Sequence, residues 1–122
     1  MENLEPVHKV NRMASQGDVL FRRVDSLPKG AELKKQAGSR VVVAHSDAGH
    51  HHAIDDVGVA VYTSGDPLKS YLVFDATEFA TVHHLRDAHK HDALQLLGGQ
   101  GAIWEVIRQR EFGPEGWRRV ED

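Results

Sequence analysis

Histidine is the residue whose number and spacing in this chain point most directly to chemistry. The stretch HSDAGHHHAIDD, residues 45–56, holds four histidines and three aspartates in twelve positions. Imidazole and carboxylate groups are ligands of Zn, Fe, Ni, Mn and Cu. The chain has nine histidines, and eight of them fall between His45 and His91. This concentration predicts a histidine-cluster site that holds a divalent transition metal.

The spacing of the histidines selects the candidate ligands. Residues i and i+2 of a strand face the same side, about 6.5–7 Å apart along the backbone. His50 and His52 can therefore converge on one ion, whereas His51 faces away. A second H-x-H pair and a double histidine follow downstream. The predicted metal ligands are His50, His52, His84, His89 and His91. Which of His83, His84 and His89 completes the site stays open, and Asp47 or Asp55 could add a carboxylate.

Composition restricts the alternatives. A chain of 122 residues forms one domain with a modest core. Because there is no cysteine, disulfides, Fe–S clusters and thiolate zinc sites are excluded. A net charge of −3 gives no reason to expect a nucleic-acid partner. No apolar run is long enough to cross a membrane or to act as a signal peptide, so we expect a cytoplasmic protein.

The elements that must position these histidines read as strands. Residues 1–16 have no periodicity and predict a flexible N-terminal arm, and residues 17–122 predict a single β domain. The polar stretch 31–39 reads as a connection and residues 87–92 read as a loop. Strands are expected over 17–24, 40–45, 57–64, 70–76, 79–85, 93–97 and 102–112. About seven or eight short strands at this spacing predict an all-β fold, a small barrel or sandwich.

The order of these motifs resembles a family of small uncharacterised bacterial and phage proteins. The similar segments are QGDVL…LPKG (16–30), RVVVAHSDAGHHHAI (40–54), YLVF (71–74), HKHDALQLLGG (89–99) and WEVIRQREFGPEGWRRVED (104–122). The resemblance covers residues 16–122. It singles out Gly49, His50, His52 and His91 as positions that match the family's motifs, and it matches Gln109, Arg110 and Glu111 to a terminal motif. It implies no established activity.

A looser similarity is to cupins, small β-barrels with an H-x-H pair and a later histidine on a facing strand. HHHAID (50–55) and the histidines at 83–91 follow that order. Three hypotheses result. The chain is a metal-binding β protein, a structural or oligomeric interaction protein with a structural ion or a pH-responsive histidine cluster, or a cupin-type enzyme acting on a small molecule. A homo-oligomer is expected, because exposed strand edges often pair between copies.

Overall fold

Every regular element in the described part of the chain is a β-strand. This computed structural model describes residues 7–16, 18–35, 41–45, 50–54, 58–86, 89–108, 110–113 and 116–119. The strands are β1 (Val7–Val10), β2 (Met13–Gln16), β3 (Val19–Val24), β4 (Glu32–Lys35), β5 (Val41–His45), β6 (His50–Ile54), β7 (Val59–Thr63), β8 (Lys69–Phe74), β9 (Ala80–Arg86), β10 (His89–Leu96), β11 (Ile103–Arg108), β12 (Arg110–Gly113) and β13 (Gly116–Arg119). The prediction of an all-β fold is confirmed.

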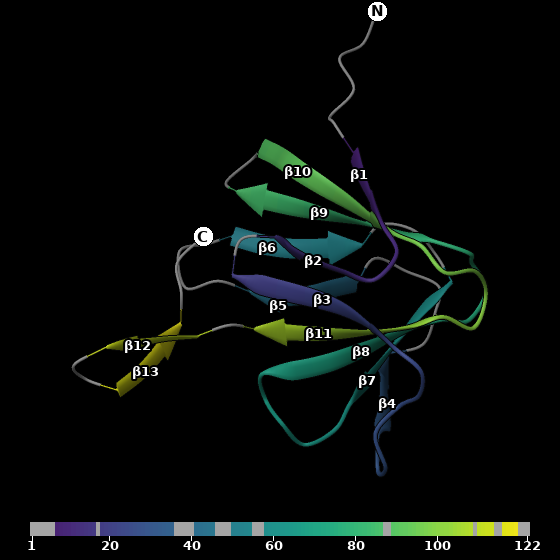
Figure 1. Ribbon diagram of the computed structural model, residues 1–122, viewed down its shortest axis with the longest axis horizontal. Coiled ribbons are helices and arrows are strands. Elements are labelled where there is room, and N and C mark those ends of the chain that lie inside the picture. The colour runs from purple at the N-terminus through teal and green to yellow at the C-terminus, as the bar shows by residue number, and fades with distance from the viewer. Residues whose placement is uncertain are drawn as a thin grey trace, which may run out of the picture.

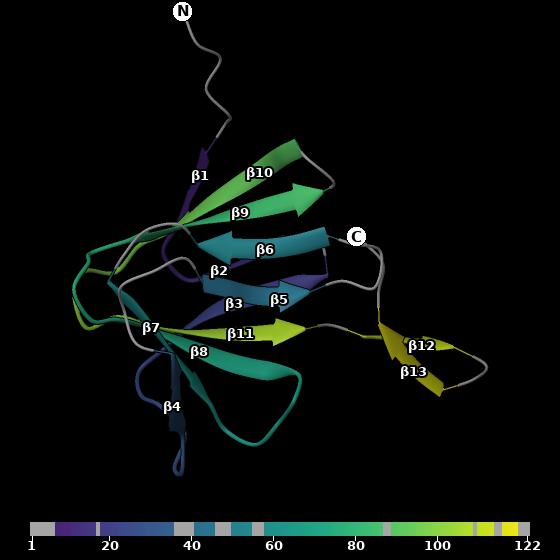
Figure 2. The ribbon, with the colours of Figure 1, turned by 180° about the vertical axis from the view of Figure 1, so that it is seen from behind.

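The strands form two sheets that pack on each other as a sandwich. One sheet has five strands in the order β1-β10-β9-β6-β5, and the other has six in the order β2-β3-β11-β8-β7-β4. Figure 1 shows β2 and β3 in front of β6 and β5, and Figure 2 shows the reverse order from behind. Among the strands that the structure describes, the two sheets are separate and not closed into a barrel, so the sandwich is the correct one of the two predicted architectures.

The core lies between the sheets because their strands alternate apolar and polar residues. In β3, for example, Val19 and Phe21 are buried and Arg22 is exposed. On β11, Trp104 is fully buried and its Nε1 donates a hydrogen bond to the carbonyl of Leu97 at 3.0 Å. The largest fully buried side chains are Trp104, Phe21, Phe74, Ile54, Leu72, Leu96 and His52. His52 is the polar member of that set.

The N-terminal segment contributes to both sheets. Residues 7–16 lie within the segment for which the sequence predicts an arm, yet they form two strands. β1 pairs parallel with β10 at the edge of the five-stranded sheet, and β2 pairs antiparallel with β3 at the edge of the six-stranded sheet. The chain crosses between the sheets over only residues 11–12, so these two short edge strands join the layers.

The number of strands exceeds the predicted seven or eight, since the described residues form thirteen. β4 replaces the predicted connection, and β10 begins at His89, inside the predicted loop. The single strand expected over 102–112 is two, β11 and β12. Within the described residues β12 pairs with β13 alone, as a hairpin outside both sheets (Figure 1).

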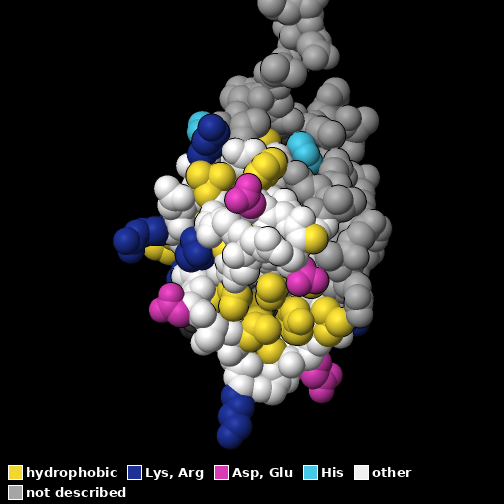
Figure 3. All heavy atoms as spheres, turned by 90° about the vertical axis from the view of Figure 1, so that its right-hand side faces the viewer, with side chains coloured by type: hydrophobic (Ala, Val, Ile, Leu, Met, Phe, Trp, Pro, Cys, Tyr) yellow, Lys and Arg dark blue, Asp and Glu magenta, His cyan; other side chains and the backbone are white. Residues whose placement is uncertain are grey.

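The sandwich has two distinct ends. β6 begins at His50, β9 ends at Arg86 and β10 begins at His89, so these strands share one end, which we call the histidine end. Figure 3 views the opposite end, where a group of hydrophobic side chains is exposed between acidic and basic ones. No helix in the described residues is long and apolar enough to span a membrane.

Candidate functional site

Strand register aligns three predicted ligands in one row across the five-stranded sheet. His52 on β6 is the cross-strand partner of His84 on β9, and His84 is in turn the partner of His91 on β10. Directly opposed residues of an antiparallel pair lie on the same face of the sheet. The backbone therefore places these three positions side by side on one face at the histidine end.

The other predicted positions fall into neighbouring rows. His50 is opposite Arg86, which is opposite His89, so His50 and His89 lie one row nearer the end of the strands. His51 pairs with Leu85, and His83 pairs with Ala53, each one residue out of phase with His52. Asp47 and Asp55, the predicted carboxylates, lie outside the described residues.

His52 is the predicted ligand whose side chain is described, and it is fully buried between the sheets. Gln16, at the end of β2 on the facing sheet, lies against it. The Nε2 atom of Gln16 donates a hydrogen bond to the carbonyl of Val82 at 3.0 Å. Its Oε1 lies 2.8 Å from Nδ1 of His52. Because an amide oxygen only accepts hydrogen bonds, Nδ1 of His52 carries the hydrogen in this pair.

The second ring nitrogen of His52 faces a carboxylate. Its Nε2 lies 3.4 Å from Oδ1 of Asp18, a residue that precedes β3 and is 1% exposed. With the hydrogen fixed on Nδ1, Nε2 of a neutral ring is a lone pair. An imidazole nitrogen and a carboxylate oxygen at this separation can share a proton or bind one divalent ion together.

Gln16 and Asp18 were not among the predicted site residues. Both lie in the stretch QGDVL, in which a polar residue stands on each side of Gly17 immediately before a strand. A charged residue buried in a small core is costly unless it is paired, so it signals a site once its burial is known. The sequence alone gave no reason to expect that burial.

The described side chains contain part of the predicted constellation. The side chains of His50, His84, His89 and His91 are outside the described set, although their backbone register is within it. Among the side chains that the structure describes, no group of three or more histidine, aspartate or glutamate residues could hold a metal ion. His52 and Asp18 are the two potential ligands that it brings together.

A second polar cluster lies on the outer face of the six-stranded sheet. Glu105 on β11 is 5% exposed, and its Oε1 accepts a hydrogen bond from Nη2 of Arg22 at 2.6 Å. Its Oε2 accepts a hydrogen bond from the hydroxyl of Tyr71 at 2.8 Å. Burial raises the pKa of Tyr71, and the hydrogen bond to Glu105 and the charge of that carboxylate raise it further. The cluster joins three neighbouring strands of this sheet, β3, β11 and β8.

One comparison with known proteins identifies the family of the chain. The model of a family described as "Domain of unknown function (DUF8820)" matches residues 15–109. The chain belongs to this family. The DUF8820 match begins beside Gln16, includes Asp18 and His52, and ends after Arg108, so it covers both sheets from β2 onward and leaves out the β12–β13 hairpin. No curated protein and no solved structure matches the chain.

DUF8820 membership confirms the coarser form of the predicted resemblance, namely that the chain belongs to an uncharacterised family. The finer motif pattern, the bacterial or phage origin and the similarity to cupins stay predictions.

Proposed function

We propose that this DUF8820 chain binds a divalent transition-metal ion at the histidine end. In this proposal Nε2 of His52 and a carboxylate oxygen of Asp18 are two ligands, and His84 and His91 complete the set. His50 and His89, in the neighbouring row, do not bind the ion in this proposal. Relative to the prediction from sequence, the proposal adds Asp18 and selects His84 from the three open candidates.

The separation of the two described atoms supports the proposal most. Two ligands with Zn–N and Zn–O bonds near 2.0–2.2 Å lie about 3.4 Å apart when they subtend a tetrahedral angle. Nε2 of His52 and Oδ1 of Asp18 are 3.4 Å apart. Gln16 adds the outer contact that is typical of a metal-binding histidine, in which the other ring nitrogen donates to an oxygen and so fixes the ring.

The register supports the choice of the remaining ligands. Directly opposed side chains on neighbouring strands have Cβ atoms about 5 Å apart, close enough for imidazoles to converge on one ion. His84 is opposite His52, and His91 is opposite His84. Three histidines and one carboxylate would form a closed, four-coordinate site, which is typical of a structural ion. Loss of one of these ligands to water would give a site able to activate that water.

A second candidate uses the same pair without a metal. A proton on Nε2 of His52 would make His52 and Asp18 a buried ion pair. The two atoms of this pair, Nε2 and Oδ1, are 3.4 Å apart. The chain would then be a non-enzymatic structural or interaction protein whose sheets are joined by that pair. A homo-oligomer and a small-molecule ligand stay predictions under either candidate.

A zinc titration of protein purified without an affinity tag separates the two candidates. The metal proposal expects one Zn²⁺ per chain and a rise in melting temperature on addition of Zn²⁺. His52→Ala should abolish both effects. His8→Ala, which removes an exposed histidine from β1, is the matched control and should bind as the wild type does. Equal zinc binding by the wild type and by His52→Ala would contradict the proposal.

A further inference from the structure

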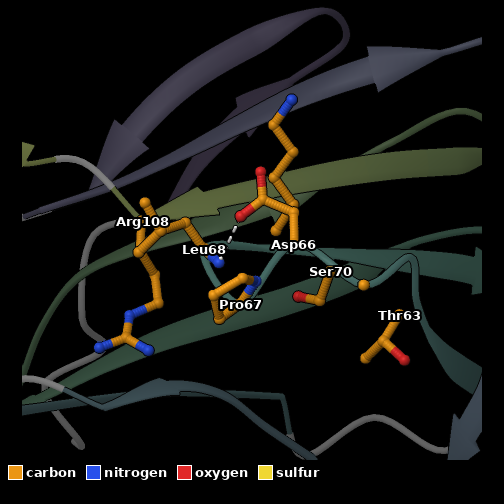
Figure 4. Close-up of a pocket in the computed structure, with 8 residues that line it drawn as sticks. Thr63, Asp66, Pro67, Leu68, Ser70 and Arg108 are labelled. Atoms are coloured by element: carbon orange, nitrogen blue, oxygen red, sulfur yellow. Dashed lines mark hydrogen bonds between the residues drawn. The ribbon is translucent and has the colours of Figure 1, made fainter.

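A hollow of about 290 Å³ lies at the histidine end, on the side of the six-stranded sheet. The turn between β7 and β8 forms one wall, and the end of β11 forms another (Figure 4). The residues that line it are Thr63, Gly65, Asp66, Pro67, Leu68, Lys69, Ser70 and Arg108. Its volume is near the lower limit for small-molecule sites.

Arg108 is the residue of this hollow that points to a ligand. It is the cross-strand partner of Val19, a core residue, so it lies on the inner face of the sheet where the sandwich opens. Its backbone N–H donates to the carbonyl of Leu68 at 2.8 Å, which holds the end of β11 against the β7–β8 turn. Within the described part of the chain, its Nε is buried and has no hydrogen-bond partner.

A buried guanidinium donor without a hydrogen-bond partner is unfavourable, and it is more so because the group is charged. Loss of a proton does not relieve this cost, because arginine stays charged at all ordinary pH values. A planar guanidinium presents a fork of N–H donors that fits the two oxygens of a carboxylate or phosphate group. Such a ligand would satisfy the donor that the described residues leave without a partner.

Asp66, the acidic residue of the hollow, is hydrogen-bonded within its own turn. Oδ1 of Asp66 accepts a hydrogen bond from the backbone N–H of Leu68 at 2.9 Å. The carbonyl of Asp66 accepts another from the N–H of Lys69 at 3.1 Å. Figure 4 shows the guanidinium of Arg108 directed away from the Asp66 carboxylate. The lining therefore has two cations, Arg108 and Lys69, against one anion, Asp66, a net charge of +1.

We propose that this hollow binds an oxyanion, the carboxylate or phosphate group of a small molecule, through the guanidinium of Arg108. The side chains of Ser70 and Thr63 line the same hollow, and their hydroxyl groups are further donors available to a small molecule bound there. The proposal does not depend on a bound metal. Because Arg108 is opposite Val19, the residue after Asp18, the hollow and the His52–Asp18 pair share one end of the sandwich.

The test follows the Nε–Hε signal of Arg108 by ¹H–¹⁵N NMR during titration with inorganic phosphate and, separately, with acetate. EDTA is present throughout. The signal is assigned by its absence from Arg108→Gln. We expect a saturable shift with at least one anion, and the anion that binds more tightly identifies the ligand as a phosphate or a carboxylate. For the variants, which lack this signal, the backbone amide signals of Leu68 and Lys69 in the wall of the hollow follow the same titrations. Arg108→Gln should weaken binding at least tenfold. Arg108→Lys keeps the charge without the fork and should weaken it less.

Arg12→Gln is the matched control, because it removes an exposed arginine at the start of β2, the opposite end from Gln16. It should bind the anion as the wild type does. The proposal is overturned if neither anion gives a saturable shift, if Arg108→Gln binds equally well, or if binding is lost in Arg12→Gln instead. Anion binding that appears only when EDTA is replaced by Zn²⁺ would place the anion on a metal and would also overturn it.

Discussion

Oε1 of Gln16 lies 2.8 Å from Nδ1 of His52, so a side chain of one sheet determines which nitrogen of a histidine on the other sheet carries the hydrogen. The same amide donates through Nε2 to the carbonyl of Val82 on β9. Gln16 thus holds β2, β6 and β9 together and turns Nε2 of His52 toward Asp18. An edge strand that the sequence does not reveal orients the central residue of the candidate site.

Replacing Gln16 by leucine should weaken both the fold and the site. The Gln16→Leu variant leaves Nδ1 of His52 and the Val82 carbonyl without these hydrogen bonds, so the free energy of unfolding should fall by about 1–3 kcal/mol. Metal affinity should fall about 10–100-fold, because the histidine ring loses its outer contact. Urea denaturation and a chelator-competition titration measure the two effects.

Gln100→Leu is the control for this change. Nε2 of Gln100 also donates to a backbone carbonyl, that of Asp75 at 3.0 Å, but Gln100 is exposed. This variant should change stability by no more than about 0.5 kcal/mol and leave zinc affinity unaltered. A Gln16→Leu protein with wild-type zinc affinity would argue against the role given to Gln16.

Asp18→Asn tests whether the carboxylate of Asp18 is a metal ligand. Asparagine keeps the shape of the side chain but removes the charge, so zinc affinity should drop by at least about tenfold. Asp25→Asn makes the same change at an exposed position after β3 and should bind zinc normally. The measurement is isothermal titration calorimetry with Zn²⁺. Equal affinities for the two variants would remove Asp18 from the proposed ligand set.

Part of the candidate site could be predicted from the sequence and part could not. Two-residue periodicity separates His52 from His51, and the register has the same phase. Periodicity within one strand cannot supply the pairing between strands, however, and that pairing aligns His84 with His52. Nor does it show that Gln16 and Asp18 are buried, because their burial depends on the facing sheet.

Gly58 is expected to be intolerant of any side chain. Its φ of +96° is unfavourable for other residues, and a Cβ placed there would lie 2.8 Å from both the carbonyl carbon and the oxygen of Ala76. Gly58→Ala should lower the free energy of unfolding by about 2–4 kcal/mol. Gly65→Ala, at φ +91° with nothing within 4 Å of the Cβ, isolates the backbone term and should lower it by about 1 kcal/mol. Urea denaturation that ranks the two equally would contradict this reasoning.

Tyr71 makes stability depend on pH in the alkaline range. Burial and the hydrogen bond to Glu105 raise its pKa above the ordinary value of 10.0, so the folded chain holds this proton more tightly than the unfolded chain does. The stabilisation is fully present below pH 10 and is lost as the pH rises through the folded-state pKa. Tyr71→Phe should be less stable at pH 7 by about 1 kcal/mol, with a shallower decline above pH 10.

Tyr62→Phe is the control for the alkaline effect, since Tyr62 is the cross-strand neighbour of Tyr71. It should retain the wild-type decline. Denaturant unfolding at a series of pH values from 7 to 11 provides the comparison, and identical profiles for the wild type and Tyr71→Phe would refute the assignment to Tyr71.

The fold was predictable where strands are rich in β-branched residues or bounded by turns. The strands expected over 57–64 and 70–76 are confirmed as β7 and β8, which pair with each other. The missed strands lie mostly at edges. Ser15 of β2 and Glu32 and Lys34 of β4 are exposed, so these short segments give little apolar alternation. Such strands are defined by their pairing with a neighbouring strand, and the residue types of the segment do not indicate that pairing.

Anomalous X-ray scattering from crystals of untagged protein grown with Zn²⁺ decides whether a metal ion lies between His52 and Asp18. We expect a strong peak at the zinc edge, about 2.0–2.2 Å from both Nε2 of His52 and the carboxylate of Asp18. The peak should be absent from His52→Ala crystals grown in the same way. A wild-type map with no peak between His52 and Asp18 would contradict the account.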